Sequence, residues 1–220
     1  MDWTAIWLSL RLAVCTTLIL FVVGLPLAYW LASTRFRGRF LIEAVIALPI
    51  VLPPTVVGFY LLCAMGPHSS VGRLYESVTG GTLPFSFMGI LVGSVLFNVP
   101  FAVRPFAAAF ATVDRRLVEA SWCLGVSRFK TFLRIICPLA WPGLLTGLIL
   151  TFAHTVGEFG VVLMVGGNIP AVTRTISIAI YDDVQAMDYT AAHQTSLALL
   201  AFAFLTLAIT YALQRRVVTI

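Results

Sequence analysis

Charged residues are scarce in this chain. Only 10% of its 220 residues are Asp, Glu, Lys or Arg, whereas 60% are hydrophobic, and the mean hydropathy is +1.00. A chain of this size and composition has too little polar surface to coat a water-soluble domain. The composition therefore excludes a soluble globular protein and predicts a membrane protein.

Several signatures of chemistry are missing as well. The four cysteines are scattered, without a CxxC pair or a nearby histidine pair, so neither a disulfide nor a metal site is expected. The single lysine, Lys130, follows no glycine-rich loop, so the Walker motif that binds ATP phosphates is absent. No nucleophile or ligand set converges in the sequence. We expect no cofactor and no enzymatic activity; if transport here uses ATP, a separate subunit hydrolyses it.

Long uncharged runs dominate what is present. They cover residues 12–34, 44–72, 77–103, 135–157 and 189–214, and each exceeds the roughly 20 residues that a transmembrane helix needs. The sequence predicts an all-α polytopic membrane protein, a single transmembrane domain over residues 1–220. Its five spans are expected at about 12–34, 44–66, 86–108, 139–161 and 193–214.

The second and third of these spans are rich in proline. Pro53 and Pro54 fall in the second, and Pro100 and Pro105 in the third, so several carbonyl groups lose their partner within the helix. In lipid such groups must be satisfied by neighbouring helices or by water in a cavity. The alternative is that these are ordinary prolines of transmembrane helices; together they favour a packed bundle that lines a pathway.

The arginines and the lysine fix the expected orientation. Eleven of the fourteen basic residues lie on one side of the five predicted spans and three lie on the other. Because cytoplasmic loops carry the excess of Lys and Arg, the N-terminus is expected outside and the C-terminus in the cytoplasm. The net charge of +5 then reflects topology, and no nucleic-acid partner is expected.

The cytoplasmic loop, residues 111–138, is the one long basic segment. Asp114 is a plausible N-cap for a short helix over 115–124, and Gly125 stands where a helix readily stops. Beyond it, apolar residues recur at helical spacing: Val126, Phe129, Phe132, Leu133 and Ile136. The pattern predicts a protruding hairpin of two short helices. The alternative is a basic amphipathic loop that lies on anionic lipid headgroups.

The spacing inside this loop resembles the EAA signature of binding-protein-dependent ABC importer permeases. The matching residues are Glu119, Ala120, Ser121, Gly125, Ile135 and Pro138, with Ser121 in place of the second alanine and Cys137 in place of a leucine. The resemblance implies that the loop forms coupling helices which dock on a cytoplasmic ATPase. It assigns ATPase coupling to Glu119, Ala120, Ser121, Gly125 and Pro138.

The same resemblance implies an assembly in the bacterial inner membrane. It comprises a homodimer of the permease in the lipid bilayer, two cytoplasmic ATP-binding cassette ATPase subunits and an external substrate-binding protein.

A second stretch is similar to molybdate ABC transporter permeases. It comprises Gly-Glu-Phe-Gly at 157–160 and Gly-Gly-Asn-Ile-Pro at 166–170, with Ala171 where that family usually has glycine. The resemblance implies molybdate transport and a periplasmic or extracellular molybdate-binding protein. Permeases for tungstate and for sulfate look alike here, so these oxyanions stay open as alternatives.

The external loop, 158–190, and its approach hold the other candidate residues. His154 and Glu158 are four residues apart and are expected to share a helix face. Three roles stay open for them: a gate or pathway contribution, packing or hydrogen bonding between helices, and a metal or catalytic role. Thr173, Arg174, Thr175 and Ser177 would offer donors to an oxyanion, but tight binding would oppose release. Our hypothesis is that Arg174 and Asn168 dock the binding protein or form the outer mouth; the alternative is a solvated loop arginine. The candidates for the pathway or outer mouth are Glu158, Asn168, Thr173 and Arg174.

Two other protein classes stay as alternatives. An ion-coupled secondary transporter would need repeated halves and intramembrane charges, and five spans do not divide into halves. A membrane-embedded enzyme would need the converging ligand set that is missing.

Overall fold

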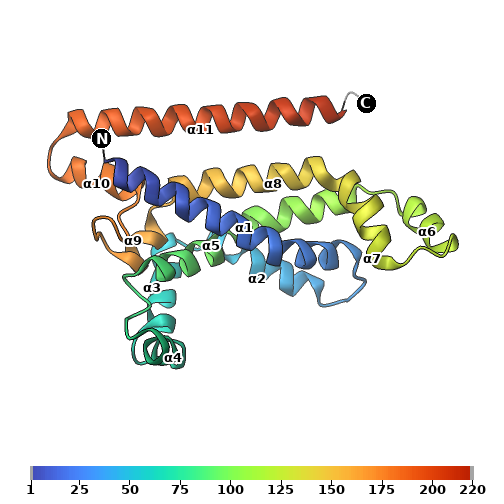
Figure 1. Cartoon of the computed structure of the whole chain (residues 1–220), viewed down its shortest axis with the longest axis horizontal. Coiled ribbons are helices and arrows are strands. Elements are labelled where there is room, and N and C mark those ends of the chain that lie inside the picture. Colours follow the sequence, from blue (N-terminus) through green and yellow to red (C-terminus); the bar gives the residue numbers. More distant parts are fainter. Residues whose placement is uncertain (1, 219–220) are drawn as a thin grey trace.

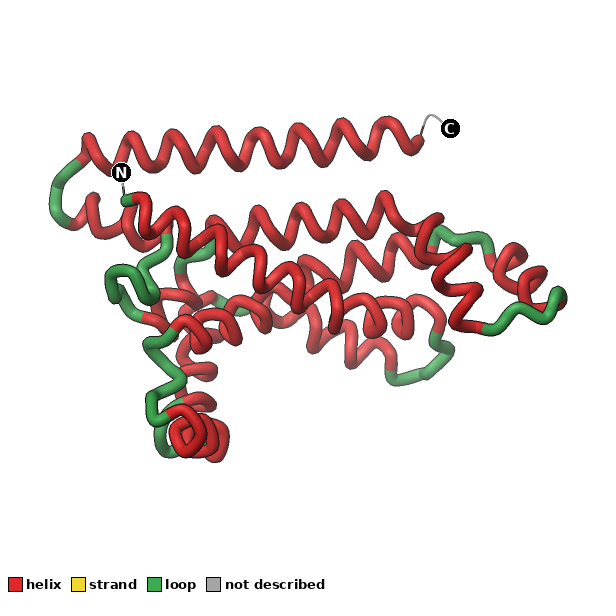
Figure 2. Tube along the Cα trace, viewed as in Figure 1, coloured by secondary structure: helices red, strands yellow, loops and turns green. Residues whose placement is uncertain are grey.

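The computed structural model describes residues 2–218, and side chains as far as residue 212; within this range it consists of helices joined by loops, without strands (Figure 2). The elements are α1 (Trp3–Ser33), α2 (Arg39–Val51), α3 (Pro54–Met65), α4 (Ser70–Thr79), α5 (Phe87–Ala111), α6 (Arg115–Cys123), α7 (Arg128–Thr131), the π-helix η1 (Phe132–Ile136), α8 (Cys137–Gly157), α9 (Gly160–Gly166), α10 (Ile176–Gln185) and α11 (Tyr189–Val218). The predicted all-α fold class is confirmed.

Within the described residues, four helices are long and apolar enough to cross a membrane. They are Trp3–Ser33, Phe87–Ala111, Arg128–Gly157 and Tyr189–Ala212. The second predicted span, 44–66, is not a straight helix, because α2 and α3 meet at an angle of 110°. Leu52 and Pro53 are extended at the break, as expected of residues that precede prolines. The chain therefore has five spans only if this bent pair counts as one.

The core lies where α1, α5 and α8 pack together. Phe106 of α5 and Leu144 of α8 are fully buried there, beside Leu20 of α1. Glycines permit the close approach of α5 and α8: a Cβ added at Gly147 would lie 2.7 Å from the Phe106 ring, and one at Gly143 would lie 2.5 Å from Ala109 Cβ. Small residues at helix contacts are the usual means of packing helices in membranes.

The remaining elements surround this three-helix core. α11 runs along the outside (Figure 1), and 11% of its apolar window is buried. The α6 and α7 segment projects from the end of the bundle opposite the N-terminus and α10, while α4 lies across the direction of the long helices (Figure 1). The two ends of the bundle thus present different structures: a helical hairpin at one, and α9, α10 and their loops at the other.

Candidate functional site

The projecting segment, residues 114–138, forms a helical hairpin as predicted, and we call it the coupling hairpin after the role that we propose for it below. Asp114 Oδ1 accepts a hydrogen bond of 2.8 Å from the Arg116 backbone N–H, so the predicted N-cap is confirmed. α6 ends at Cys123, and Gly125 follows with φ of 74°, the left-handed region that favours glycine. The glycine therefore makes the turn between the two arms, as predicted.

A buried hydroxyl pair joins the arms of the coupling hairpin. Ser121 Oγ of α6 lies 2.8 Å from Thr131 Oγ1 of α7, and both residues are buried. Glu119 and Ala120, by contrast, are exposed on α6. Among the candidate coupling residues, Ser121 therefore supports the hairpin from inside, whereas Glu119 and Ala120 lie on the surface that a partner can reach.

The surface of the coupling hairpin also carries apolar side chains. Leu124 is 83% exposed and Phe129 is 72% exposed, and the Arg128 guanidinium lies 5.6 Å from the centroid of the Trp122 ring. The apolar residues that were predicted at helical spacing differ in exposure. Ile136 is buried, while Phe129 and Leu133 are exposed. The π-helix η1, Phe132–Ile136, lies within this stretch.

The second arm of the coupling hairpin runs directly into a span. α7, η1 and α8 form one helical run from Arg128 to Gly157, and Pro138 is exposed in the first turn of α8. At the base, the Phe132 ring lies 5.0 Å from that of Tyr29 on α1 and 5.9 Å from that of Phe110 on α5. The hairpin is therefore continuous with α8 and packs at its base on α1 and α5.

A polar cluster lies at the other end of α8. Asn98 of α5 is fully buried and donates through Nδ2 to Glu158 Oε2, at 3.1 Å, and to the Ser94 carbonyl. His154 Nδ1 lies 2.8 Å from Asn98 Oδ1, which can only accept, so this ring nitrogen carries the proton. The predicted shared face of His154 and Glu158 is thus completed by Asn98, which the sequence pattern alone did not assign to it.

The turn after Glu158 packs on the break between α2 and α3. A Cβ added at Gly160 would lie 2.6 Å from Pro54 Cβ, so only glycine permits this contact. A hollow of about 570 Å³ opens here, and Pro54, Thr55, Phe97, His154 and Glu158 contribute to its lining. The Gly-Glu-Phe-Gly stretch therefore places a buried carboxyl group beside an open space where three helix ends meet.

The predicted oxyanion donors of the external loop are largely engaged within the protein. Thr173 Oγ1 donates to the Gly166 carbonyl at 2.7 Å and accepts from the Ile169 N–H, while Ser177 Oγ donates to the Gly157 carbonyl. Thr173 is fully buried. Its role in the structure is to close the turn that contains Gly-Gly-Asn-Ile-Pro.

Arg174 belongs to a polar triad with Asn168 and Asp182 of α10. Its Nη2 lies 3.0 Å from Asp182 Oδ2, and its Nε donates to Asn168 Oδ1 at 2.6 Å. Asn168 Nδ2 donates in turn to Asp182 Oδ1 at 2.8 Å. The side chains of Arg174 and Asp182 are 25% and 39% exposed, so Arg174 is not a free loop arginine. Asp182 is the member of this triad that the sequence pattern did not reveal.

Ala171, which stands where the molybdate permeases are expected to have glycine, has a left-handed backbone. Its φ is 63°, a conformation in which an L-residue is strained by its Cβ and which glycine adopts without that cost. Among the described residues, no group of three or more His, Cys, Asp or Glu side chains could hold a metal ion.

The described residues thus form a bundle of membrane-length helices with a basic hairpin at one end and polar loops at the other. The chain matches the family described as "Binding-protein-dependent transport system inner membrane component" over residues 24–219. It belongs to that family, and it is therefore an inner-membrane component of a transport system.

Curated relatives match most of the chain. It is 50% identical to the molybdenum transport system permease protein ModB of Azotobacter vinelandii, over 97% of this chain and 95% of the relative. It is 38% identical to ModB of Escherichia coli strain K12, over 84% and 80%. A probable sulfate transport system permease protein cysT of Chlorella vulgaris is 30% identical, over 96% and 79%.

Solved structures share the fold. The inward-facing MetNI methionine ABC transporter matches with a TM-score of 0.73 at 19% identity, over 97% of this chain and 94% of that one. A bacterial alginate ABC transporter in complex with a pentasaccharide-bound periplasmic protein matches with a TM-score of 0.74 at 17% identity, over 97% and 78%. At these identities the likeness concerns the fold alone.

Proposed function

We propose that this chain is the permease subunit of an ATP-driven importer that carries molybdate across the inner membrane. The observation that carries the proposal is the 50% identity to ModB over 97% of the chain. The proposed assembly is a homodimer of this chain with two cytoplasmic ATPase subunits and an external molybdate-binding protein. ATP hydrolysis is assigned to the partner subunits, and this chain provides the passage.

The proposed mechanism uses the continuity of the coupling hairpin with α8. ATPase closure would push on the surface that carries Glu119 and Ala120, with Gly125 shaping the turn and Pro138 at the start of α8. Because residues Arg128 to Gly157 form one helical run, movement of the hairpin would displace the far end of α8, beside Glu158. Two arrangements of a packed bundle, rather than continuous bending, are the usual basis of such switching.

The orientation follows from the same proposal. The coupling hairpin and the C-terminus face the cytoplasm and the N-terminus faces outwards, as the distribution of basic residues predicts. The loop with Glu158, Asn168, Thr173 and Arg174 then lies on the side of the binding protein. We propose that Arg174 and Asn168 form part of the outer mouth or of the docking surface for that protein.

Reconstitution tests the substrate. The chain would be placed in lipid nanodiscs with its ATPase, and ATP turnover would be measured with binding protein loaded with molybdate, tungstate or sulfate. Stimulation by molybdate supports the proposal. Stimulation by sulfate alone would contradict it and favour the function named for the sulfate permease relative; equal stimulation by tungstate would widen the substrate to both oxyanions.

The coupling hairpin is tested separately by association with the ATPase. Glu119→Lys and Gly125→Pro should leave the protein in the membrane but reduce the amount of ATPase that co-purifies with it. Glu76→Lys, the same charge change at an exposed position of α4, is the matched control and should retain the ATPase. Undiminished co-purification with both hairpin variants would remove the coupling role.

A further inference from the structure

A hollow of about 320 Å³ opens between three helix ends on the hairpin side of the bundle. Its walls come from the end of α1, the start of α2 and the last turns of α5, and they include Arg39, Glu43 and Arg104. Three alanines of α5, Ala107, Ala108 and Ala111, also line it. The alanines leave the space open because their side chains are small, so the hollow has one charged edge and one apolar wall.

The charges in this hollow do not balance. Arg39 Nε pairs with Glu43 Oε1 at 2.6 Å, whereas Arg104 has no ion pair or hydrogen bond with any side chain of residues 2–212. Arg104 lies inside a candidate span, about two turns before the end of α5. Arg104 is exposed, and a cation within a span normally pairs with an anion or reaches the interface. Its unpaired guanidinium is therefore available to an anion at this site.

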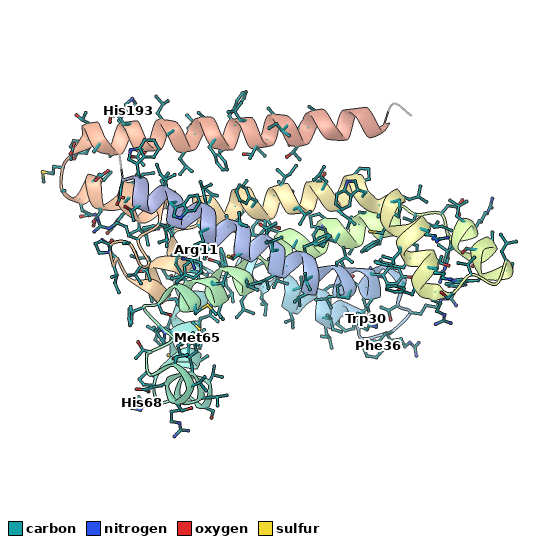
Figure 3. The ribbon with its side chains drawn as sticks, in the orientation of Figure 1. Arg11, Trp30, Phe36, Met65, His68 and His193 are labelled. Atoms are coloured by element: carbon teal, nitrogen blue, oxygen red, sulfur yellow. The ribbon has the colours of Figure 1, made fainter. Side chains whose placement is uncertain are left out.

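The surroundings of the hollow mark the level of a membrane interface. Trp30 and Phe36, at the turn between α1 and α2, are 40% and 59% exposed, and both lie beside this end of α1 in Figure 3. Tryptophan is one of the two residues that gather at the headgroup level of a bilayer, so Trp30 marks this level. With the orientation proposed above, this is the cytoplasmic leaflet, which carries anionic lipids, and basic pockets between helices on that side bind lipid head groups.

We propose that this hollow binds the phosphate of an anionic phospholipid of the hairpin-side leaflet, with Arg104 as the main contact. The apolar wall, which includes Val103 and the three alanines, receives the upper part of an acyl chain. A free oxyanion would use Arg104 but would leave this wall uncovered, so the lipid is the occupant that satisfies both edges. The proposal depends on the orientation of the chain and not on the transported substrate.

Retention of lipid by the purified protein tests this site. The wild-type chain, exchanged into detergent with added phosphatidylglycerol or phosphatidylcholine, would be measured by native mass spectrometry. We expect bound phosphatidylglycerol in preference to phosphatidylcholine. Arg104→Gln should weaken retention by about tenfold, because it removes a charge-assisted hydrogen bond, and Arg104→Lys should retain most of it.

Two further variants test whether lipid retention depends on this hollow or on the overall charge of the protein. Ala108→Leu keeps the charge but fills the hollow, and it should also release the lipid; Arg73→Gln, on exposed α4, is the matched control and should not. A thermal melt of each variant verifies the fold. Equal retention of phosphatidylglycerol in Arg104→Gln and wild type would overturn the proposal. Arg104-dependent binding of inorganic phosphate or molybdate without lipid retention would overturn it in favour of a free anion.

Discussion

Ser121 Oγ lies 2.8 Å from Thr131 Oγ1, and this buried contact is what joins α6 to α7 in the coupling hairpin. Thr131 Oγ1 is also 3.1 Å from the Ser127 carbonyl, to which it donates. The two hydroxyls are therefore not equivalent. Ser121 makes a single contact with the second arm, whereas Thr131 links the first arm to the start of its own helix.

This asymmetry predicts unequal effects of removing the two hydroxyls. Ser121→Ala should cost about 0.5 to 1 kcal/mol of local stability, because Thr131 keeps its bond to Ser127. Thr131→Val should cost more, about 1 to 2 kcal/mol, because it leaves Ser121 buried without a partner. Hydrogen exchange of residues 115–136 measures both. Equal loss of protection in the two variants would contradict the asymmetry, and wild-type protection in both would show that the hydroxyl pair does not hold the hairpin.

Two positions with left-handed backbone should respond in opposite directions to exchange of glycine and alanine. Gly125 has φ of 74° and Ala171 has φ of 63°. Gly125→Ala should destabilise the hairpin and Ala171→Gly should stabilise the external loop, each by about 1 kcal/mol, since the left-handed conformation strains residues with a Cβ. Thermal melts report both changes. Destabilisation by Ala171→Gly would show that the strain at residue 171 is not relieved by removal of its Cβ.

Most of the fold could be predicted from the sequence, because the length and hydropathy of the uncharged runs indicate the membrane spans directly. The straight spans and the N-cap of α6 follow from local residues, as does the turn at Gly125. The bend between α2 and α3 was signalled by Pro53 and Pro54, but its 110° angle depends on packing against Gly160, which is distant in the sequence. Local rules predict where a helix breaks, not the direction in which the chain continues.

Only part of the candidate site could be predicted from the sequence, because contacts between distant elements complete it. His154 and Glu158 share a face because of their spacing, yet Asn98, which connects them, lies on another helix. Asp182 likewise meets Arg174 from α10. The sequence did not show that Ser121 is buried while Glu119 and Ala120 are exposed. This difference arises only where the two arms of the hairpin pack together. Contacts between elements carry this information, and a single sequence does not.

The buried contact between Asn98 and Glu158 predicts that the cost of replacing Asn98 depends on whether Glu158 is present. Asn98→Leu leaves the 5% exposed Glu158 without its amide donor, and we expect a cost of about 2 to 3 kcal/mol. Adding Glu158→Leu should recover part of it, because replacing both members of this pair by apolar groups is less costly than removing one. Recovery stays incomplete because His154 Nδ1 has lost its Asn98 acceptor in both variants. The midpoint of thermal unfolding in detergent measures the single and double variants. Additive losses in the double variant would show that the two side chains act independently.

Variants of the triad of Arg174, Asn168 and Asp182 can distinguish two roles of Arg174: holding the external loop, and acting at the outer mouth. Arg174→Ala should cost about 1 kcal/mol, as expected of a partly exposed pair, and should reduce uptake at limiting molybdate. Exchanging the charges, with Arg174→Asp and Asp182→Arg together, preserves the ion pair, and the Asn168 amide can reverse its donor and acceptor to suit.

If Arg174 also faces the binding protein, the double variant should regain its melting temperature but not its uptake at limiting molybdate, because the positive charge has moved to α10. The measurement is the melting temperature beside uptake by proteoliposomes that contain the ATPase and the binding protein. Recovery of both would assign Arg174 to holding the loop alone, and unchanged uptake in Arg174→Ala would remove it from the outer mouth.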